Sequence, residues 1–190
     1  MAALLLCHLV VGAGIVVAGR RLGRPALGPA AAPPVLTLLW LASQWSTVSE
    51  GGSVEESFSW VPELGLAIDL RLDGMAALMV LLVSGIGLLV TVYAASYFPT
   101  SSDGLGRLIG LLVLFAGAML GLVLADHLLV LYGFWELTSI ASFFLIGNRS
   151  TSARARAAAL QALLITGAGA LAMLVGFILM GQAAGSYRLS

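Results

Sequence analysis

Long apolar stretches separated by short polar segments dominate the pattern of the chain. Each stretch is close to the roughly 20 residues that a helix needs to cross a bilayer. The pattern therefore predicts an all-α transmembrane protein with about six membrane-spanning helices. The expected spans are Ala2–Gly19, Pro34–Val48, Leu72–Phe98, Leu108–Ala125, His127–Ile146 and Ala157–Gly181.

The polar segment between the second and third spans has a different periodicity. Apolar residues occupy every second position of Leu66–Leu72, which is typical of a β-strand. Phe58–Val61 can pair with this strand across Pro62–Gly65, because the fixed φ of proline suits a turn. We therefore expect a small β-hairpin-like loop here, with an irregular loop as the alternative.

The arginines predict how the chain is oriented in the membrane. They gather in the connections that follow the first, third and fifth spans, and the segment before the third span is acidic instead. Because arginine-rich connections stay in the cytoplasm, we expect the N-terminus and the hairpin loop to lie outside. The arginines concerned are Arg20, Arg21, Arg24, Arg107, Arg149, Arg154 and Arg156.

Composition limits the function further. The mean hydropathy is +1.05, so the chain lacks the polar shell of a soluble domain. The formal net charge is zero and there is no lysine, which argues against a nucleic-acid partner. One cysteine, Cys7, and two histidines are too few for a disulfide, a haem, an iron–sulfur cluster or a metal site. We expect no cofactor and no metal.

Glu136 is the main candidate for a functional residue, because it lies near the middle of the fifth span. A carboxylate at that depth costs about 2.5–3.5 kcal/mol and usually faces protein or water. Tyr132 and Ser139 share its helical face and can hydrogen-bond to it or hold water, and Thr138 adds polarity on a neighbouring strip. This arrangement suits proton binding and release, and the alternative is a structural hydrogen bond between helices.

Asp126 and His127 form a second acid/base pair at the start of the same span. The nine residues from His127 to Glu136 correspond to about 13 Å along a helix, and the two side chains point in roughly opposite directions. We therefore favour a helix N-cap for Asp126 and an interfacial position for His127 over proton conduction by this pair.

The motif Gly117-x-x-x-Gly121 in the fourth span indicates close helix packing. Small residues let helices approach where lipid gives no hydrophobic drive for association. The glycine-rich stretch Val10–Gly19 lacks both the spacing and the preceding strand of a dinucleotide-binding motif.

The segment Ala125–Gly147, with the string WELTS at Trp135–Ser139, resembles the fifth helix of the A subunit of Mrp-type multisubunit Na⁺/H⁺ antiporters. It is more distantly similar to the antiporter-like L subunit of respiratory complex I. Phe58–Gly74 is similar to the loop before the third helix of that family. The resemblance implies a component of a monovalent cation/H⁺ antiporter that is not itself an enzyme, assembled with other hydrophobic subunits in a bacterial cytoplasmic membrane. It also implies that Glu136 pairs with a lysine on a seventh helix, and that Asp126 belongs to the motif.

Members of that family have fourteen or more helices, including a repeated five-helix antiporter module. The resemblance divides this chain into a three-helix region, residues 1–107 with the outer loop 49–73, and the first three helices of an incomplete module, residues 108–190. The lysine helix lies beyond them, so we expect a fragment, a truncated reading frame or one piece of a split subunit.

Two alternatives stay open. One is an antiporter-like proton-pumping subunit of a complex I-like NADH-quinone oxidoreductase or a membrane hydrogenase, and the other is a transport-inactive membrane scaffold.

Overall fold

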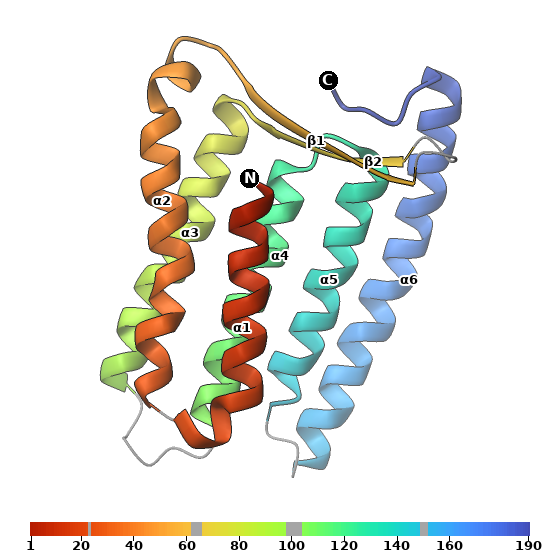
Figure 1. Cartoon of the computed structure of the whole chain (residues 1–190). Coiled ribbons are helices and arrows are strands. Elements are labelled where there is room, and N and C mark those ends of the chain that lie inside the picture. The colour runs from red at the N-terminus through yellow and green to blue at the C-terminus, as the bar shows by residue number, and fades with distance from the viewer. Residues whose placement is uncertain (23, 62–65, 98–103, 149–151) are drawn as a thin grey trace.

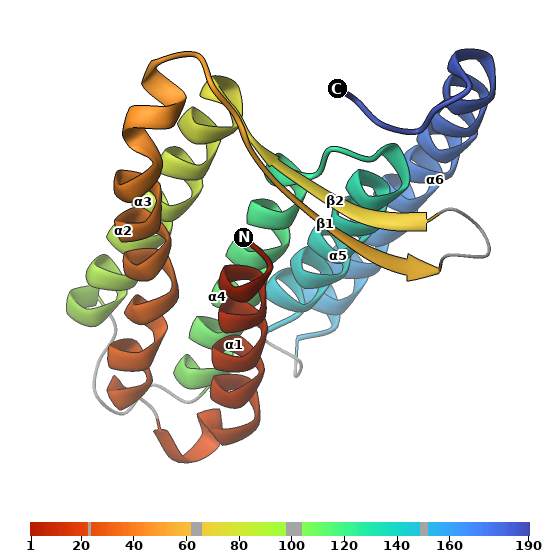
Figure 2. The same ribbon diagram turned by 45° about the horizontal axis from the view of Figure 1, so that its top comes forward.

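Six α-helices, one 3₁₀ turn and one two-stranded hairpin make up the described part of the chain in the computed structural model (Figure 1). The structure describes residues 1–22, 24–61, 66–97, 104–148 and 152–190. The helices run side by side, and the hairpin crosses one end of them (Figure 2). The elements are α1 (Ala2–Leu22), a 3₁₀ turn η1 (Arg24–Ala26), α2 (Leu27–Ser49), β1 (Val54–Val61), β2 (Leu66–Leu72), α3 (Gly74–Tyr97), α4 (Leu105–Leu124), α5 (Leu128–Ile146) and α6 (Ala153–Ala184).

Four of these helices have the length and apolar composition of membrane spans. They cover Gly74–Ala94, Leu105–Leu124, Leu128–Ile146 and Ala153–Ala184. Within the described residues, the apolar part of α1 is the shorter segment Ala2–Ala18, and α2 does not meet both conditions. The chain is therefore a mostly helical, multi-pass membrane protein. The six expected helices are all present, although two of them are less typical as spans.

The start of α2 differs from the sequence prediction. The helix begins at Leu27 rather than at Pro34, and Pro33 and Pro34 lie inside it. The predicted start comes from hydropathy, and a proline inside a helix removes a backbone hydrogen bond. Packing compensates for that loss, because the residues of one helical face are buried: Leu27, Ala30, Pro33, Pro34, Thr37 and Leu41.

The expected hairpin is present and longer than predicted. β1 pairs antiparallel with β2, and Phe58 stands opposite Ile68. The additional residues of β1 include Glu55, which lies opposite Arg71 and forms an ion pair with it at 3.6 Å. The expected turn, Pro62–Gly65, lies outside the described residues. Asp73 then begins α3, since its carboxylate accepts a hydrogen bond from the Ala76 amide at 2.9 Å.

The N-terminus, the hairpin and the C-terminal segment all lie toward one end of the bundle (Figure 1). The C-terminal end of α1 and the beginnings of α2, α4 and α6, which carry or adjoin the arginines, lie at the opposite end. This arrangement groups the charged segments as the sequence predicts. Which end faces the cytoplasm stays a prediction.

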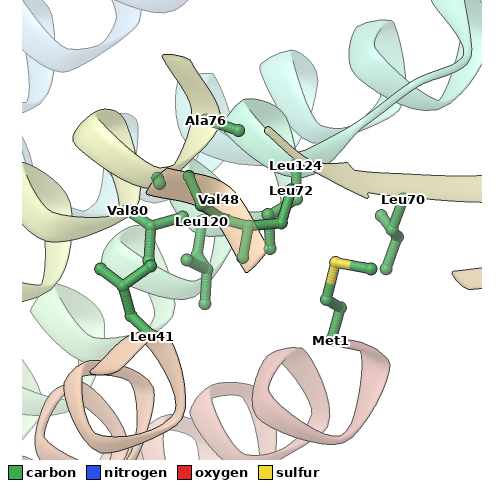
Figure 3. Close-up of a cluster of buried hydrophobic side chains, with 10 residues drawn as sticks. Met1, Leu41, Val48, Leu70, Leu72, Ala76, Val80, Leu120 and Leu124 are labelled. Carbon is green, nitrogen blue, oxygen red and sulfur yellow. The ribbon is translucent and has the colours of Figure 1, made fainter. Parts of the chain in front are cut away.

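Two buried apolar clusters hold α1–α4 together. The first lies beneath the hairpin, where Leu70 and Leu72 of β2 pack against Leu120 and Leu124 of α4 (Figure 3). The second lies at the opposite end and includes Ile15 of α1. Among the described residues, α5 and α6 contribute no side chain to either cluster. The helix that carries Glu136 therefore packs on the side of a four-helix core.

Gly117 and Gly121 of α4 serve helix packing, although they contact two different helices. A Cβ atom on Gly117 would lie 2.6 Å from the His8 Cβ of α1. A Cβ atom on Gly121 would overlap the Phe134 ring of α5. The two glycines thus let α1 and α5 approach α4 closely, as small residues do at helix contacts in membranes.

Candidate functional site

Glu136 lies midway along α5 and is half-buried. Tyr132, one helical turn earlier, lies on the same helical face as Glu136. This is the spacing at which side chains on a helix surface meet. A carboxyl group and a phenol thus stand within one turn of each other on an apolar helix, and a phenol is a hydrogen-bond donor.

Ser139 and Thr138 do not bond to Glu136. Both hydroxyl groups donate to the carbonyl oxygen of Trp135, at 3.3 Å for Ser139 and 2.7 Å for Thr138. Serine and threonine commonly bond back to the preceding helical turn in this way. Because their protons are used within α5, these hydroxyl groups present only oxygen lone pairs to their surroundings.

A cavity of about 340 Å³ lies between α4, α5 and α6, next to these hydroxyl groups. Its lining is mostly apolar, and its polar residues are Thr138, Ser139 and Ser142 of α5 and Thr166 of α6. The Thr166 hydroxyl also donates within its own helix, to Ala162 at 2.8 Å. The cavity is large enough for several waters, and its hydroxyl oxygens can accept hydrogen bonds from them.

No positive charge neutralises Glu136 in the described part of the chain. The ion pairs found there lie at the hairpin end and do not include Glu136. The sequence also contains no lysine. A cation that stabilises the Glu136 carboxylate must therefore come from outside the described residues.

His127 takes the capping role that the sequence predicts for Asp126, and both side chains are buried. His127 is the N-cap of α5, and its Nδ1 accepts a hydrogen bond from the Leu129 amide at 3.2 Å. The prediction of an Asp126 cap is wrong, because the Asp126 carboxylate binds the Ser190 hydroxyl at 2.6 Å and Arg188 at 3.5 Å instead. The backbone amide of Asp126 donates to the carbonyl oxygen of Asp69 in β2 at 2.8 Å.

We use the name hairpin cluster for Glu55, Asp69, Asp126, His127 and Arg188. Arg188 lies 3.8 Å from both Glu55 and Asp69, in addition to its pairing with Asp126. Asp69, Asp126 and His127 are only 6%, 4% and 5% exposed. Charges buried to this extent need partners, and Arg188 is the partner that the two aspartates share. The cluster therefore joins the hairpin, the start of α5 and the segment after α6.

Backbone contacts support the same junction. The Leu128 amide donates to Tyr187, and the Leu189 amide donates to Asp126. The Tyr187 ring stacks on the His127 ring at a centroid distance of 5.8 Å. The segment after α6 thus lies against the turn that begins α5.

The protonation of His127 depends on these neighbours. Burial is the largest influence and lowers the pKa of His127. The negative charge of Asp69 raises this pKa, the positive charge of Arg188 lowers it further, and the negative charge of Asp126 raises it. A lowered pKa favours the neutral ring, and only a ring with an unprotonated Nδ1 can accept the Leu129 hydrogen bond.

Arg188 and Asp69 are the polar residues of this end that sequence reasoning missed. Arg188 stands alone after the last span, and Asp69 reads as an outward position of an alternating strand. The local pattern indicates neither the burial of Asp69 nor the return of Arg188 to the hairpin.

Two family models match the chain. Residues 125–190 match the membrane region described as NADH:quinone oxidoreductase/Mrp antiporter, and residues 58–109 match the N-terminus of chain 5 of NADH-ubiquinone oxidoreductase, complex I. The first match begins just before α5 and contains Glu136.

Curated relatives match most of the chain. A probable K⁺/H⁺ antiporter A/B subunit of Rhizobium meliloti is 46% identical over 84% of this chain and 16% of its own length. The Na⁺/H⁺ antiporter A1 subunit of Staphylococcus haemolyticus is 42% identical, and the Na⁺/H⁺ antiporter A subunit of Alkalihalophilus pseudofirmus is 39% identical, each over 82% of this chain and 19% of its own length. The chain therefore spans less than a fifth of the length of these relatives.

Solved structures give the same result. A chain of the Mrp complex from Dietzia sp. DQ12-45-1b matches 99% of this chain and 20% of its own length, with a TM-score of 0.86 and 34% identity. A chain of an archaeal membrane-bound sulfane sulfur reductase matches 97% of this chain and 28% of its own length, with a TM-score of 0.79 and 22% identity. The second likeness concerns the fold alone.

Proposed function

Because the chain belongs to the family of NADH:quinone oxidoreductase and Mrp antiporter membrane subunits, we propose that it is the N-terminal part of a monovalent cation/H⁺ antiporter subunit, in which Glu136 binds and releases the proton. The observation that carries this proposal is the position of Glu136 halfway along a helix of membrane-spanning length, on the same face as Tyr132. A titratable group in a membrane span is a functional site by default.

A cation is central to the proposed mechanism. In a low-dielectric span a carboxyl group is favoured in its neutral form, and a cation brought near it favours the carboxylate. A cation that approaches Glu136 therefore drives release of the Glu136 proton, and departure of the cation drives proton uptake. The cavity between α4, α5 and α6, beside the Ser139 hydroxyl, offers room for water, and a proton can travel through water.

The cation that pairs with Glu136 belongs to a part of the antiporter outside the described residues. α5 and α6 lie beside the core of α1–α4, so further helices can pack against them. We propose residues 1–107 as an N-terminal three-helix region with its outer loop at 49–73, and residues 108–190 as the first three helices of an antiporter module, with α4 of that module packed on α1–α3. Other hydrophobic subunits, Na⁺ or K⁺, and H⁺ are the partners.

We place the complex in a bacterial cytoplasmic membrane, with the hairpin end and the N-terminus outside. The arginines at the opposite end of the bundle support this orientation. The chain acts as a transporter component and not as an enzyme.

A second function is a proton-pumping subunit of a redox-driven complex. The match of residues 58–109 to a complex I chain favours it. The two functions are separated by purifying the intact complex and measuring flavin and iron–sulfur absorbance, which a cation antiporter lacks and a redox-driven complex contains.

The proposal is tested with Glu136→Gln in the assembled complex. Glutamine has nearly the same size and cannot carry the proton, so we expect Na⁺- or K⁺-dependent H⁺ exchange in vesicles to be abolished while the complex still assembles. Glu50→Gln is the matched control, since Glu50 is an exposed glutamate at the end of α2 and its variant should exchange normally. Normal exchange in Glu136→Gln would refute the proposal.

A further inference from the structure

Residues 185–190, which we call the strap, follow α6 and turn back toward the hairpin (Figure 1). Gly185 makes the reversal possible, because its φ of +69° lies in the left-handed region that glycine adopts freely. The Tyr187 ring then lies against Gly181 of α6, where a Cβ atom would overlap it, and stacks on the His127 ring. The strap therefore lies between the end of α6 and the start of α5.

Backbone pairing carries the hairpin ladder through the start of α5 into the strap. Ala125 pairs with Leu70 of β2, and His127 pairs with Arg188 of the strap, both in the antiparallel sense. Residues 125–127 thus have β2 on one side and the strap on the other. His127 is therefore the residue against which the strap is held.

The side-chain contacts of the strap are long and can be replaced. Arg188 lies 3.5 Å from Asp126 and 3.8 Å from Asp69. Both distances exceed those of a well-formed N–H···O hydrogen bond, which are about 2.7–3.2 Å. The Arg188 side chain is also 45% exposed, whereas the two aspartates are buried. A donor that comes closer to the carboxylates can therefore replace the guanidinium, which water then solvates.

The neutral His127 ring is compatible with this arrangement, and the protonated ring is not. Nδ1 accepts a hydrogen bond from the Leu129 amide, so it carries no proton. A proton taken up from the solvent binds to Nδ1, and two donors then face each other. The cap is lost, and the imidazolium has to find acceptors elsewhere.

The groups around the ring determine where those acceptors are. Asp69 of β2 and Asp126 attract an imidazolium, and Arg188 of the strap repels it. Tyr187, which stacks on the ring, is uncharged at acid pH. A displaced Arg188 keeps its contact with Glu55 of β1 at 3.8 Å, which is an exposed and therefore weak ion pair.

We propose that the hairpin cluster is a pH-sensitive switch that holds and releases the strap. At neutral pH Arg188 pairs with the two aspartates, and the strap lies on the start of α5. At acid pH the protonated His127 pairs with the aspartates instead, Arg188 is displaced, and the strap loosens. Acidity at the hairpin end thus weakens the hold of α6 on the helix that carries Glu136. The switch goes beyond the proposed function and does not rest on it.

Hydrogen exchange in the intact complex tests the switch. The Leu189 amide donates to the Asp126 carbonyl oxygen at 3.0 Å, so its protection reports whether the strap is in place. After correction for the intrinsic pH dependence of exchange, this protection should fall about tenfold from about pH 7.5 to about pH 5, the factor for losing one contact to a charged group. Loss of protection at Leu129 alone, with Leu189 unchanged, would overturn the proposal, since the cap would then open without the strap.

Variants identify the group that titrates. His127→Asn keeps a capping oxygen and cannot be protonated, so its Leu189 protection should stay constant over the same pH range. His8→Asn is the matched control, because it removes the other histidine of the chain, which is buried against α4, and the fall in protection should remain. A fall in His127→Asn as large as in the wild type would overturn the proposal, since the carboxylates would then be its cause.

Arg188→Gln gives a second test that needs no change of pH. This variant should protect the Leu189 amide as weakly at about pH 7.5 as the wild type does at about pH 5, because its strap lacks the guanidinium. Full protection in a normally assembled Arg188→Gln complex would contradict the switch. Cation/H⁺ exchange is not measured in these experiments, so their outcome is independent of the role of Glu136.

Discussion

Arg188 and Asp126 form an ion pair in which Nη2 and Oδ2 lie 3.5 Å apart. The pair ties the segment after α6 to the residue before the N-cap of α5, and Arg188 also faces Asp69 on the hairpin. Because the two aspartates are buried and Arg188 is partly exposed, the aspartates depend on the arginine more than the arginine depends on them.

Arg188→Gln should therefore destabilise the hairpin end by about 1–3 kcal/mol, the range for a buried polar group that loses its partner. Thermal unfolding of the complex and proteolysis of the segment after α6 measure the effect. Arg154→Gln is the control, because Arg154 is exposed at the start of α6. The effect should shrink in an Asp126→Asn background, and full additivity of the two changes would contradict the pairing.

The His127 cap predicts a pH dependence. Burial lowers the pKa of His127 below its ordinary value of 6.5, so the folded protein binds this proton less readily than the unfolded chain. The contribution of neutral His127 to the free energy of unfolding is therefore complete above about pH 6.5. It is lost as the pH falls from about 6.5 to the lowered pKa of His127 in the folded protein. Asp69, Asp126 and Arg188 face the ring. The two aspartates raise the pKa of His127 back toward 6.5, so they narrow this pH range.

Hydrogen exchange of the Leu129 amide measures the cap directly. A lost cap is worth about 1 kcal/mol, so protection should fall about fivefold in the acid window. His127→Asn keeps a capping oxygen that does not titrate, and its protection should change less with pH. The same pH dependence in both proteins would show that another group is responsible.

Close packing of α4 and α5 predicts the effect of a single methyl group. Gly121→Ala places a Cβ atom against the Phe134 ring and should destabilise the complex by about 1–3 kcal/mol, as overpacking does. Gly133→Ala is the matched control, since a Cβ atom there meets nothing within 4 Å. It should be neutral or slightly stabilising because alanine is the better helix former. Equal thermal stability of the two variants would contradict the close approach.

Tyr132 and Thr138 should differ in their effect on exchange. Tyr132→Phe removes the hydroxyl on the same helical face as Glu136, one turn away, and a hydrogen bond from that hydroxyl to the carboxylate would be worth about 1.5–3 kcal/mol. We expect exchange at fixed pH to change at least several-fold. Thr138→Val should change it by less than twofold, because that hydroxyl bonds to Trp135. Similar rates of cation/H⁺ exchange by the two variants in vesicles would show that the Tyr132 hydroxyl has no role at Glu136.

Sequence reasoning located α5 and the hairpin well, because both depend on local patterns. A run of apolar residues of bilayer length specifies a helix wherever it packs, and alternation of apolar and polar residues specifies a strand. The prediction that Tyr132 shares a face with Glu136 needed only the helical repeat. The role of Glu136 stays a prediction.

Other features escaped the sequence because their causes are distant in the chain. Asp is intrinsically a better helix cap than His, yet Asp126 is drawn into the ion pair with Arg188 and leaves the cap to His127. The first half of β1 follows from its pairing with β2, where Glu55 meets Arg71. The early start of α2 follows from a buried face that outweighs its prolines.

The sequence by itself thus determined the membrane class, the number of helices, the hairpin and the position of Glu136 within a span, since hydropathy and periodicity act over one element at a time. Only the tertiary structure decided which polar groups meet. Arg188 joins Asp69 and Asp126, and His127 caps α5 in place of Asp126. The physical reason is that a buried charge or acceptor is satisfied by whichever partner folding brings within a few ångströms, and sequence distance does not constrain that partner.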